Sequence, residues 1–157
     1  MTILFVCTGN ICRSPMAEAM TRRMLAERGR TDIGVGSAGS ATGAGVPASE
    51  GAYLVGLERG LDLADHASRP LTKELVDQAD IVFGMSPHHV DRAVALGGSG
   101  KAFLLGAYAG HDGRRAEVED PFGGDLDDYR ATYDQLSELL DAALDRYLKD
   151  AGPASAG

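Results

Sequence analysis

The sequence predicts a single-domain α/β fold, in which a doubly wound, four-stranded parallel sheet carries helices on both faces. Short apolar runs alternate with helix-length segments along the chain, as in right-handed β-α-β units. The length of 157 residues suits one domain with its own core. No repeat or linker divides the chain, so residues 1–150 are expected to form one domain. Gly, Ala, Ser and Pro dominate residues 151–157, which predicts a disordered tail.

The first strand and the first helix are predicted from local chemistry. The apolar run over residues 3–6 is rich in β-branched and aromatic side chains, which favours a buried strand. Ser14 suits an N-cap and Pro15 the first position of a helix. A methionine then recurs every fourth residue from Met16 to Met24, as on one face of that helix.

The later elements follow from the same signals. Three further apolar runs predict strands over 33–37, 81–85 and 102–105. Helices are expected over 48–59, 72–77 and 86–96, and Gly60 is expected to end the first of them. After a long loop, side chains spaced by three or four residues predict a final long helix with one buried stripe, formed by Leu126, Tyr129, Tyr133, Leu136, Leu140, Ala143, Leu144 and Tyr147.

Charge and hydropathy restrict the partners. The net charge of -8 and the pI of about 4.9 argue against nucleic acid and against an anionic membrane surface. The apolar run at the N-terminus stops at Thr8, which makes it too short for a signal peptide or a membrane span. A cytoplasmic location is therefore expected.

The segment from Cys7 to Ser14 is the strongest functional signal. It joins the first strand to the first helix, and doubly wound sheets bind ligands at the carboxyl ends of their strands. Gly9 and Asn10 tolerate positive φ, which lets successive N–H groups turn inward around an anion. A helix N-terminus also favours an oxyanion, and it favours a nucleophilic thiolate at Cys7.

Arg13 completes this loop, because its planar guanidinium can bind two phosphoryl oxygens at once. Cys-x5-Arg is a weak pattern by itself, and a buried Cys7 with a surface Arg13 is the simpler alternative. The strand-loop-helix context favours catalysis instead. The sequence thus predicts a phosphate-binding loop after the first strand, formed by Thr8, Gly9, Asn10, Ile11, Cys12, Arg13 and Ser14.

Phosphate transfer from an alcohol or a phenol also needs a general acid. Asp120 is the best candidate, because Pro121 holds the preceding backbone extended and could direct the carboxyl group into a cleft. The alternative is that Asp120 is one of several solvated carboxylates.

The second cysteine, Cys12, leaves two interpretations open. Its thiol could resolve a sulfenic acid on Cys7 by forming a disulfide, or it could pack as a small apolar side chain. The spacing of the two cysteines does not decide between them.

Four segments together resemble the low-molecular-weight protein tyrosine phosphatase family, namely Cys7 to Pro15, Ser37-Ala38-Gly39, Asp65-His66-Ala67 and Asp120-Pro121. The resemblance implies that Cys7 is the nucleophile, Arg13 binds phosphate, and Asp120 protonates the leaving group and later activates water. It implies a phosphorylated protein or peptide as substrate and inorganic phosphate as product. It also implies that Cys12 is the redox partner of Cys7, and that a supporting network is formed by Asn10, Ser14, Ser37 and His66.

Two positions bear on the substrate. The stretch from Asp120 to Gly124 looks like that of the bacterial protein arginine phosphatase branch, which typically carries threonine where this chain has Ile11. Ile11 offers only an apolar wall, and Phe122 is expected to line the same substrate pocket. Because Ile11 lies in the catalytic loop, the sequence favours phosphotyrosine, with phosphoarginine as the alternative.

Other functions fit the sequence less well. An arsenate reductase with an internal triple-cysteine relay would need a third cysteine, and the chain has two. A non-catalytic phosphate-binding module would need neither a nucleophile nor an acid. His88 and His89 are adjacent and lack carboxylates at ligand spacing, so neither a metal nor another cofactor is expected.

Overall fold

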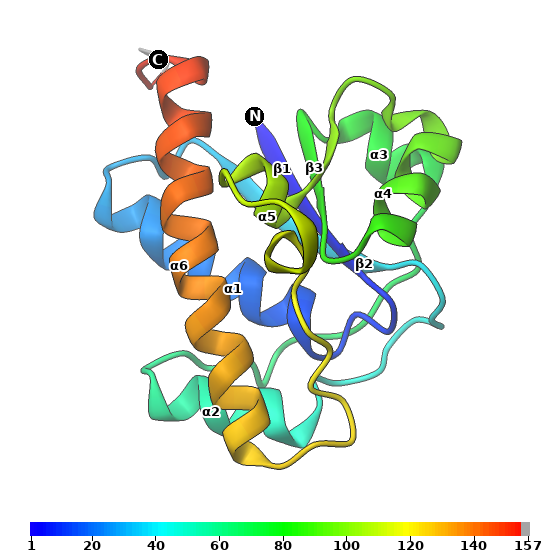
Figure 1. Ribbon diagram of the computed structural model, residues 1–157, viewed down its shortest axis with the longest axis vertical. Helices are drawn as coiled ribbons and strands as arrows, with labels where there is room; N and C mark the ends of the chain where they lie inside the picture. Colours follow the sequence, from blue (N-terminus) through cyan, green and yellow to red (C-terminus); the bar gives the residue numbers. More distant parts are fainter. Residues whose placement is uncertain (155–157) are drawn as a thin grey trace.

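The computed structural model describes residues 1–154, and it confirms the predicted fold class (Figure 1). Four parallel strands form one sheet in the order β2-β1-β3-β4. The strands are β1 (Thr2–Cys7), β2 (Gly34–Gly39), β3 (Ile81–Gly84) and β4 (Ala102–Leu104). Of the tail predicted over 151–157, residues 155–157 lie outside the described part of the chain.

Helices cover both faces of the sheet, as the doubly wound topology requires (Figure 1). One face carries α1 (Arg13–Glu27), α2 (Glu50–Glu58), α5 (Leu105–Tyr108) and α6 (Leu126–Ala151). The other carries α3 (Lys73–Gln78) and α4 (Pro87–Ala93), which a wider turn over Val94–Gly98 extends.

The central strand β1 supplies side chains to both cores, because successive residues of a strand point to opposite faces. Ile3 and Phe5 pack in the larger core with α1 and α6. Leu4 and Val6 pack in the smaller one with Val76 of α3 and Ala93 of α4. The end of β1 is thus held from both sides, which places the loop that follows it on a rigid support.

The long helix α6 has the buried stripe that its periodicity predicts. Seven of the eight predicted residues are buried, and Leu126, in the first turn, is partly buried. Asp125 caps the helix, since its side chain accepts from the N–H of Asp128 and the Asp128 carboxylate accepts in return. The helix continues to Ala151, one residue into the tail predicted from composition.

The predicted cap of the first helix was wrong. Cys12 occupies the N-cap position of α1, and Ser14 lies within the first turn. The hydroxyl of Ser14 bonds to Cys7 and Asn10, and therefore does not serve as a helix cap.

Smaller differences concern the ends of elements. The helix predicted from residue 48 begins at Glu50, with Ser49 as its cap. The strand predicted over 102–105 ends at Leu104, and Leu105 begins the short helix α5. The rest of that helix and a 3-10 turn over Gly113–Ala116 lie inside the predicted loop, where four-residue segments are too short to show a helical period.

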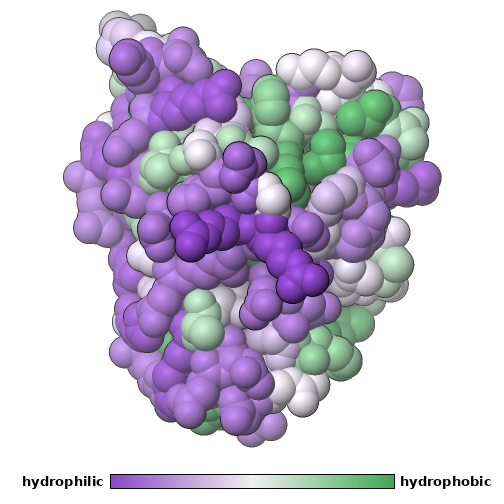
Figure 2. Space-filling model, viewed as in Figure 1, coloured by the Kyte–Doolittle hydropathy of each residue, from purple (hydrophilic) through white to green (hydrophobic). Residues whose placement is uncertain are grey.

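The face of the molecule seen in Figure 2 is largely hydrophilic, and hydrophobic residues gather at its upper right, over the region of α3 and α4. Among residues 1–154, every helix is too short or too polar to cross a membrane.

Candidate active site

The loop after β1 is shaped around Asn10. This residue has a φ of 55°, which is the only positive φ of a non-glycine residue within the described chain. Asparagine tolerates this left-handed conformation better than most residues. His66 contacts the turn directly, with its Nε2 atom 2.6 Å from the carbonyl oxygen of Asn10.

The side chain of Asn10 connects the loop to the neighbouring segments. Its amide nitrogen donates to the Oγ atoms of Ser14 at 2.8 Å and Ser37 at 2.9 Å. Its amide oxygen accepts from the backbone N–H of Arg69 at 3.0 Å. The structure therefore brings Asn10, Ser14, Ser37 and His66 together, and it adds Arg69, which sequence reasoning missed.

Ser14 connects this network to Cys7, the predicted nucleophile. Its Oγ lies 2.9 Å from the sulfur of Cys7, and both side chains are buried. Since the Ser14 oxygen already accepts from Asn10, its own hydrogen is free to be donated to the sulfur. A hydrogen bond of this kind stabilises the thiolate that a nucleophilic cysteine requires.

Gly39 of β2 explains part of the Ser37-Ala38-Gly39 motif. The backbone of Gly39 pairs with Cys7, and a Cβ atom built on it would lie 2.7 Å from the carbonyl oxygen of Thr8. Any larger residue would press on the loop, so this close approach favours glycine.

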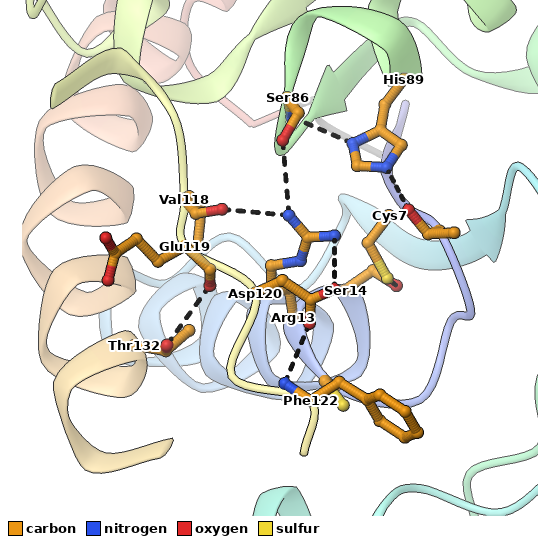
Figure 3. Close-up of polar contacts among 12 residues, drawn as sticks. Cys7, Arg13, Ser14, Ser86, His89, Val118, Glu119, Asp120, Phe122 and Thr132 are labelled. Atoms are coloured by element: carbon orange, nitrogen blue, oxygen red, sulfur yellow. Dashed lines mark hydrogen bonds and ion pairs between the residues drawn. The ribbon is translucent and has the colours of Figure 1, made fainter. Parts of the chain in front are cut away.

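The guanidinium of Arg13 is held by two distant segments, although the side chain lies at the start of α1 (Figure 3). Its Nη1 donates to the carbonyl oxygen of Val118 at 3.0 Å and to the Oγ of Ser86 at 3.4 Å. Its Nη2 lies 3.6 Å from the carboxylate of Asp120. Because Arg13 is buried and supported in this way, its planar fork is already positioned before an anion binds.

A cavity of about 200 Å³ opens over this loop. It is lined by Cys7, Thr8, Gly9, Ile11, Cys12, Arg13, Asp120 and Phe122. The predicted nucleophile, the arginine and the predicted acid thus line the same cavity, although Asp120 is more than a hundred residues from Cys7 in the sequence. The Asp120 carboxylate also accepts from the N–H of Phe122 at 3.0 Å, which orients it (Figure 3).

Part of the wall of this cavity is apolar. Ile11 contributes an aliphatic side chain, and Phe122, which is 68% exposed, stands at the rim. A large exposed aromatic side chain beside a catalytic cavity can contact a bound ligand. Both residues predicted to form the substrate pocket therefore line it.

The thiol of Cys12 has contacts of its own. Its sulfur lies 3.1 Å from the Oγ of Ser49 and 3.4 Å from the hydroxyl of Tyr129. Burial raises the pKa of Cys12 above its ordinary value, and burial with the Cys12 contact raises the pKa of Tyr129 to about 12. Cys12 is therefore a protonated thiol at neutral pH, and both cysteines are free.

His89 is a further residue that sequence reasoning missed. Its side chain is buried and lies 2.9 Å from the hydroxyl of Thr8, the residue after Cys7. Burial, with the nearby charges of His88 and Arg13, lowers the pKa of His89 to about 3. The spacing of Ser86 and His89, which form a capping box at the start of α4, was the signal that could have located it.

Among the residues that the structure describes, no group of three or more His, Cys, Asp or Glu side chains is arranged to hold a metal ion. The residues that line the cavity include two thiols, a guanidinium and one carboxylate, a set that suits an anion better than a cation.

Known proteins resemble this chain over almost its full length. The sequence model of the low molecular weight phosphotyrosine protein phosphatase family matches residues 2–152. A protein-arginine-phosphatase from Bacillus subtilis is 40% identical over 152 residues, which are 96% of this chain and 99% of that protein. The low molecular weight protein-tyrosine-phosphatase PtpB of Staphylococcus haemolyticus is 35% identical over 89% of this chain and 95% of its own.

Solved structures of phosphatases from the same two groups resemble the fold of this chain. The low molecular weight protein tyrosine phosphatase from T. tengcongensis superimposes with a TM-score of 0.86 at 37% identity, covering 93% of this chain and 99% of that one. A YwlE arginine phosphatase, in a cysteine-to-serine mutant with a phosphorylated active-site serine, gives a TM-score of 0.84 at 41% identity, over 95% and 96% of the two chains.

Proposed function

Because the chain belongs to the low molecular weight phosphotyrosine protein phosphatase family, we propose that it hydrolyses phosphotyrosine through a phosphocysteine on Cys7. It is a cysteine-dependent phosphatase, which takes a phosphorylated protein and releases inorganic phosphate. The observation that carries the proposal is the shared cavity of Cys7, Arg13 and Asp120, whose remaining walls include Ile11 and Phe122.

In the first step, the Cys7 thiolate attacks phosphorus, and a sulfur–phosphorus bond forms as the bond to the phenolic oxygen breaks. Arg13 and the loop N–H groups stabilise the phosphoryl oxygens in the transition state. The phosphorylated serine in the YwlE mutant supports a covalent intermediate at the position of Cys7.

Asp120 would act in both steps. Its proton passes to the departing tyrosine oxygen, and its carboxylate then takes a proton from the water that attacks the phosphocysteine. The sulfur–phosphorus bond breaks in that second step, which releases phosphate and returns Cys7 to the thiolate.

The walls of the cavity favour phosphotyrosine. An aromatic ring can pack against the side chains of Ile11 and Phe122, whereas a guanidinium has several N–H donors that need acceptors. Neither of these two side chains offers one.

Phosphoarginine is the second candidate, and specific observations favour it. The arginine phosphatases of Bacillus subtilis and Geobacillus stearothermophilus are 40% and 41% identical to this chain. The Asp-Pro-Phe-Gly-Gly stretch over residues 120–124 also resembles that branch.

A substitution at Ile11 separates the two substrates. We expect the wild type to have a higher kcat/KM on a phosphotyrosine peptide than on the matching phosphoarginine peptide. Ile11→Thr adds a hydroxyl that can bind a guanidinium, and should shift the ratio toward phosphoarginine by roughly 10-fold. Ile11→Val, which keeps an apolar wall, is the matched control. A wild type that prefers phosphoarginine would instead favour the second candidate.

We also propose that Cys12 protects Cys7 from irreversible oxidation. Peroxide would convert Cys7 to a sulfenic acid, and the Cys12 thiol would then displace water and form a disulfide. We expect mass spectrometry of the peroxide-treated protein to find this disulfide, with activity restored by dithiothreitol. In the wild type, sulfonic acid on Cys7 without the disulfide would contradict the proposal. In Cys12→Ala, which cannot form the disulfide, peroxide should convert Cys7 to sulfonic acid.

We also propose a cellular location for the protein. Two free cysteines fit a reducing compartment, and the net charge of -8 disfavours nucleic acid and anionic membranes as partners. We therefore place the protein in the cytoplasm, with residues 1–150 as its catalytic domain. Fractionation of cells that express it should recover it with cytosolic markers, and recovery with membranes would overturn this placement.

A further inference from the structure

His89 connects the two segments that meet behind the catalytic loop. It lies at the start of α4, which follows β3, and its side chain reaches toward the end of β1 (Figure 3). One ring nitrogen, Nδ1, accepts from the backbone N–H of Ser86 at 3.0 Å. The other, Nε2, lies 2.9 Å from the Oγ of Thr8.

These contacts decide where the proton of His89 lies. A backbone N–H can only donate, so Nδ1 carries no hydrogen. A neutral imidazole must then carry its hydrogen on Nε2, and the burial of the ring favours the neutral form. His89 therefore donates to Thr8, and the oxygen of Thr8 accepts.

This assignment leaves the hydrogen of the Thr8 hydroxyl available. In the described part of the chain, its one other partner is the His88 ring, with Nε2 at 3.5 Å, at the outer limit of a hydrogen bond. Thr8 also follows Cys7 directly and lines the catalytic cavity with Cys7 and Asp120. A second, more polar cavity of about 390 Å³ adjoins it and shares Thr8, Arg13 and Asp120.

We propose that His89 is a positioning residue, which holds the Thr8 hydroxyl so that it donates to an oxygen of the phosphoryl group attached to Cys7. The inference rests on the proposed phosphocysteine mechanism. Thr8 adds a side-chain donor to the loop N–H groups and to Arg13. Without His89, the hydroxyl is free to rotate, and its orientation must be restored in each catalytic cycle.

The lengths of asparagine and glutamine allow a sharp test. At position 89, the carbonyl oxygen of the shorter Asn lies near the place of Nδ1, so His89→Asn keeps the acceptor for the Ser86 N–H and loses the donor to Thr8. The amide nitrogen of the longer Gln reaches the place of Nε2, so His89→Gln restores the donor. Thr8→Val removes the hydroxyl but keeps the branched shape. His111 lines neither of the two cavities, so His111→Gln is the control for loss of an imidazole.

We expect His89→Asn to lower kcat for p-nitrophenyl phosphate by roughly 10-fold with little change in KM, and His89→Gln to recover most of that loss. In the Thr8→Val background, the two substitutions should have the same kcat, because the group through which His89 acts is gone. Thermal unfolding of each variant reports whether the fold is retained.

Two results would overturn this role. One is a loss from His89→Asn that is as large with valine at position 8 as with threonine. The other is a pair of Asn and Gln variants that are equally impaired and equally destabilised, which would indicate a purely structural histidine. If the wild type itself does not turn over the substrate, that result contradicts the proposed function as well as the role of His89. The first two results contradict only the role of His89.

Discussion

Cys7→Ser should lower the turnover of p-nitrophenyl phosphate by about 10⁴-fold or more. A serine hydroxyl is not ionised at neutral pH, and within residues 1–154 no basic side chain hydrogen-bonds to the side chain at position 7 to activate it. The contact of residue 7 is the hydroxyl of Ser14, which the amide of Asn10 already engages. This network suits a thiolate, and it would leave a serine protonated and weakly nucleophilic.

The same variant should still bind orthophosphate, with a Kd within about 10-fold of the wild type by isothermal titration calorimetry. Arg13 remains supported by Val118 and Ser86, and the loop N–H groups remain in place. Cys12→Ser is the matched control, since its sulfur contacts Ser49 and Tyr129, and its turnover should fall by less than about 10-fold. Turnover by Cys7→Ser at near wild-type rates would exclude the phosphocysteine mechanism.

Asp120→Asn should lower kcat/KM for a phosphotyrosine peptide by roughly 10²–10³-fold. Tyrosine is a poor leaving group without a proton, because the pKa of its hydroxyl is about 10. The substitution preserves the local turn, since the Asn oxygen can still accept from the N–H of Phe122. The measured loss therefore reports the missing proton.

The substrate distinguishes this role from a structural one. The p-nitrophenolate ion is a much weaker base than tyrosinate and leaves readily without protonation. Asp120→Asn should therefore lower kcat/KM for p-nitrophenyl phosphate by a factor at least about 10-fold smaller than for the phosphotyrosine peptide. The parameter kcat/KM is the appropriate measure, because it covers the steps through formation of the phosphocysteine. Asp127→Asn, at an exposed position paired with Arg130, serves as the control. Equal losses on both substrates would argue against Asp120 as the acid.

Local sequence signals predicted the parts of the site that are contiguous. Cys7 to Ser14 could be recognised because strand, turn and helix follow one another within a few residues. The stripe of α6 was predictable for a similar reason, since a helix repeats its period over many turns. The cap at Ser14 was wrongly predicted, because propensity ignores the bonds to Cys7 and Asn10 that compete for its hydroxyl.

Residues brought in from distant segments were harder to find. Ser37 and His66 entered only through resemblance, since a single serine or histidine carries no local signal. Asp120 was a candidate from its place before Pro121, and the resemblance then implied its role. Val118 contacts Arg13, and Arg69 contacts Asn10, through backbone atoms, which no side-chain pattern reveals. His89 was considered only as a metal ligand beside His88 and set aside, although it is buried against Thr8.

The α/β class, the strand-loop-helix around Cys7 and the family could all be predicted from the chain alone, because each depends on short-range periodicity or on motifs whose order is kept along the sequence. The oxygen or nitrogen atom that each side chain of the site contacts depends instead on the three-dimensional arrangement of distant segments. This arrangement places Asp120 3.6 Å from Arg13 and brings His89 to Thr8. The contact of His89 with Thr8 depends on how β1 and β3 lie side by side in the parallel sheet, which aligns the carboxyl ends of strands that are far apart in sequence.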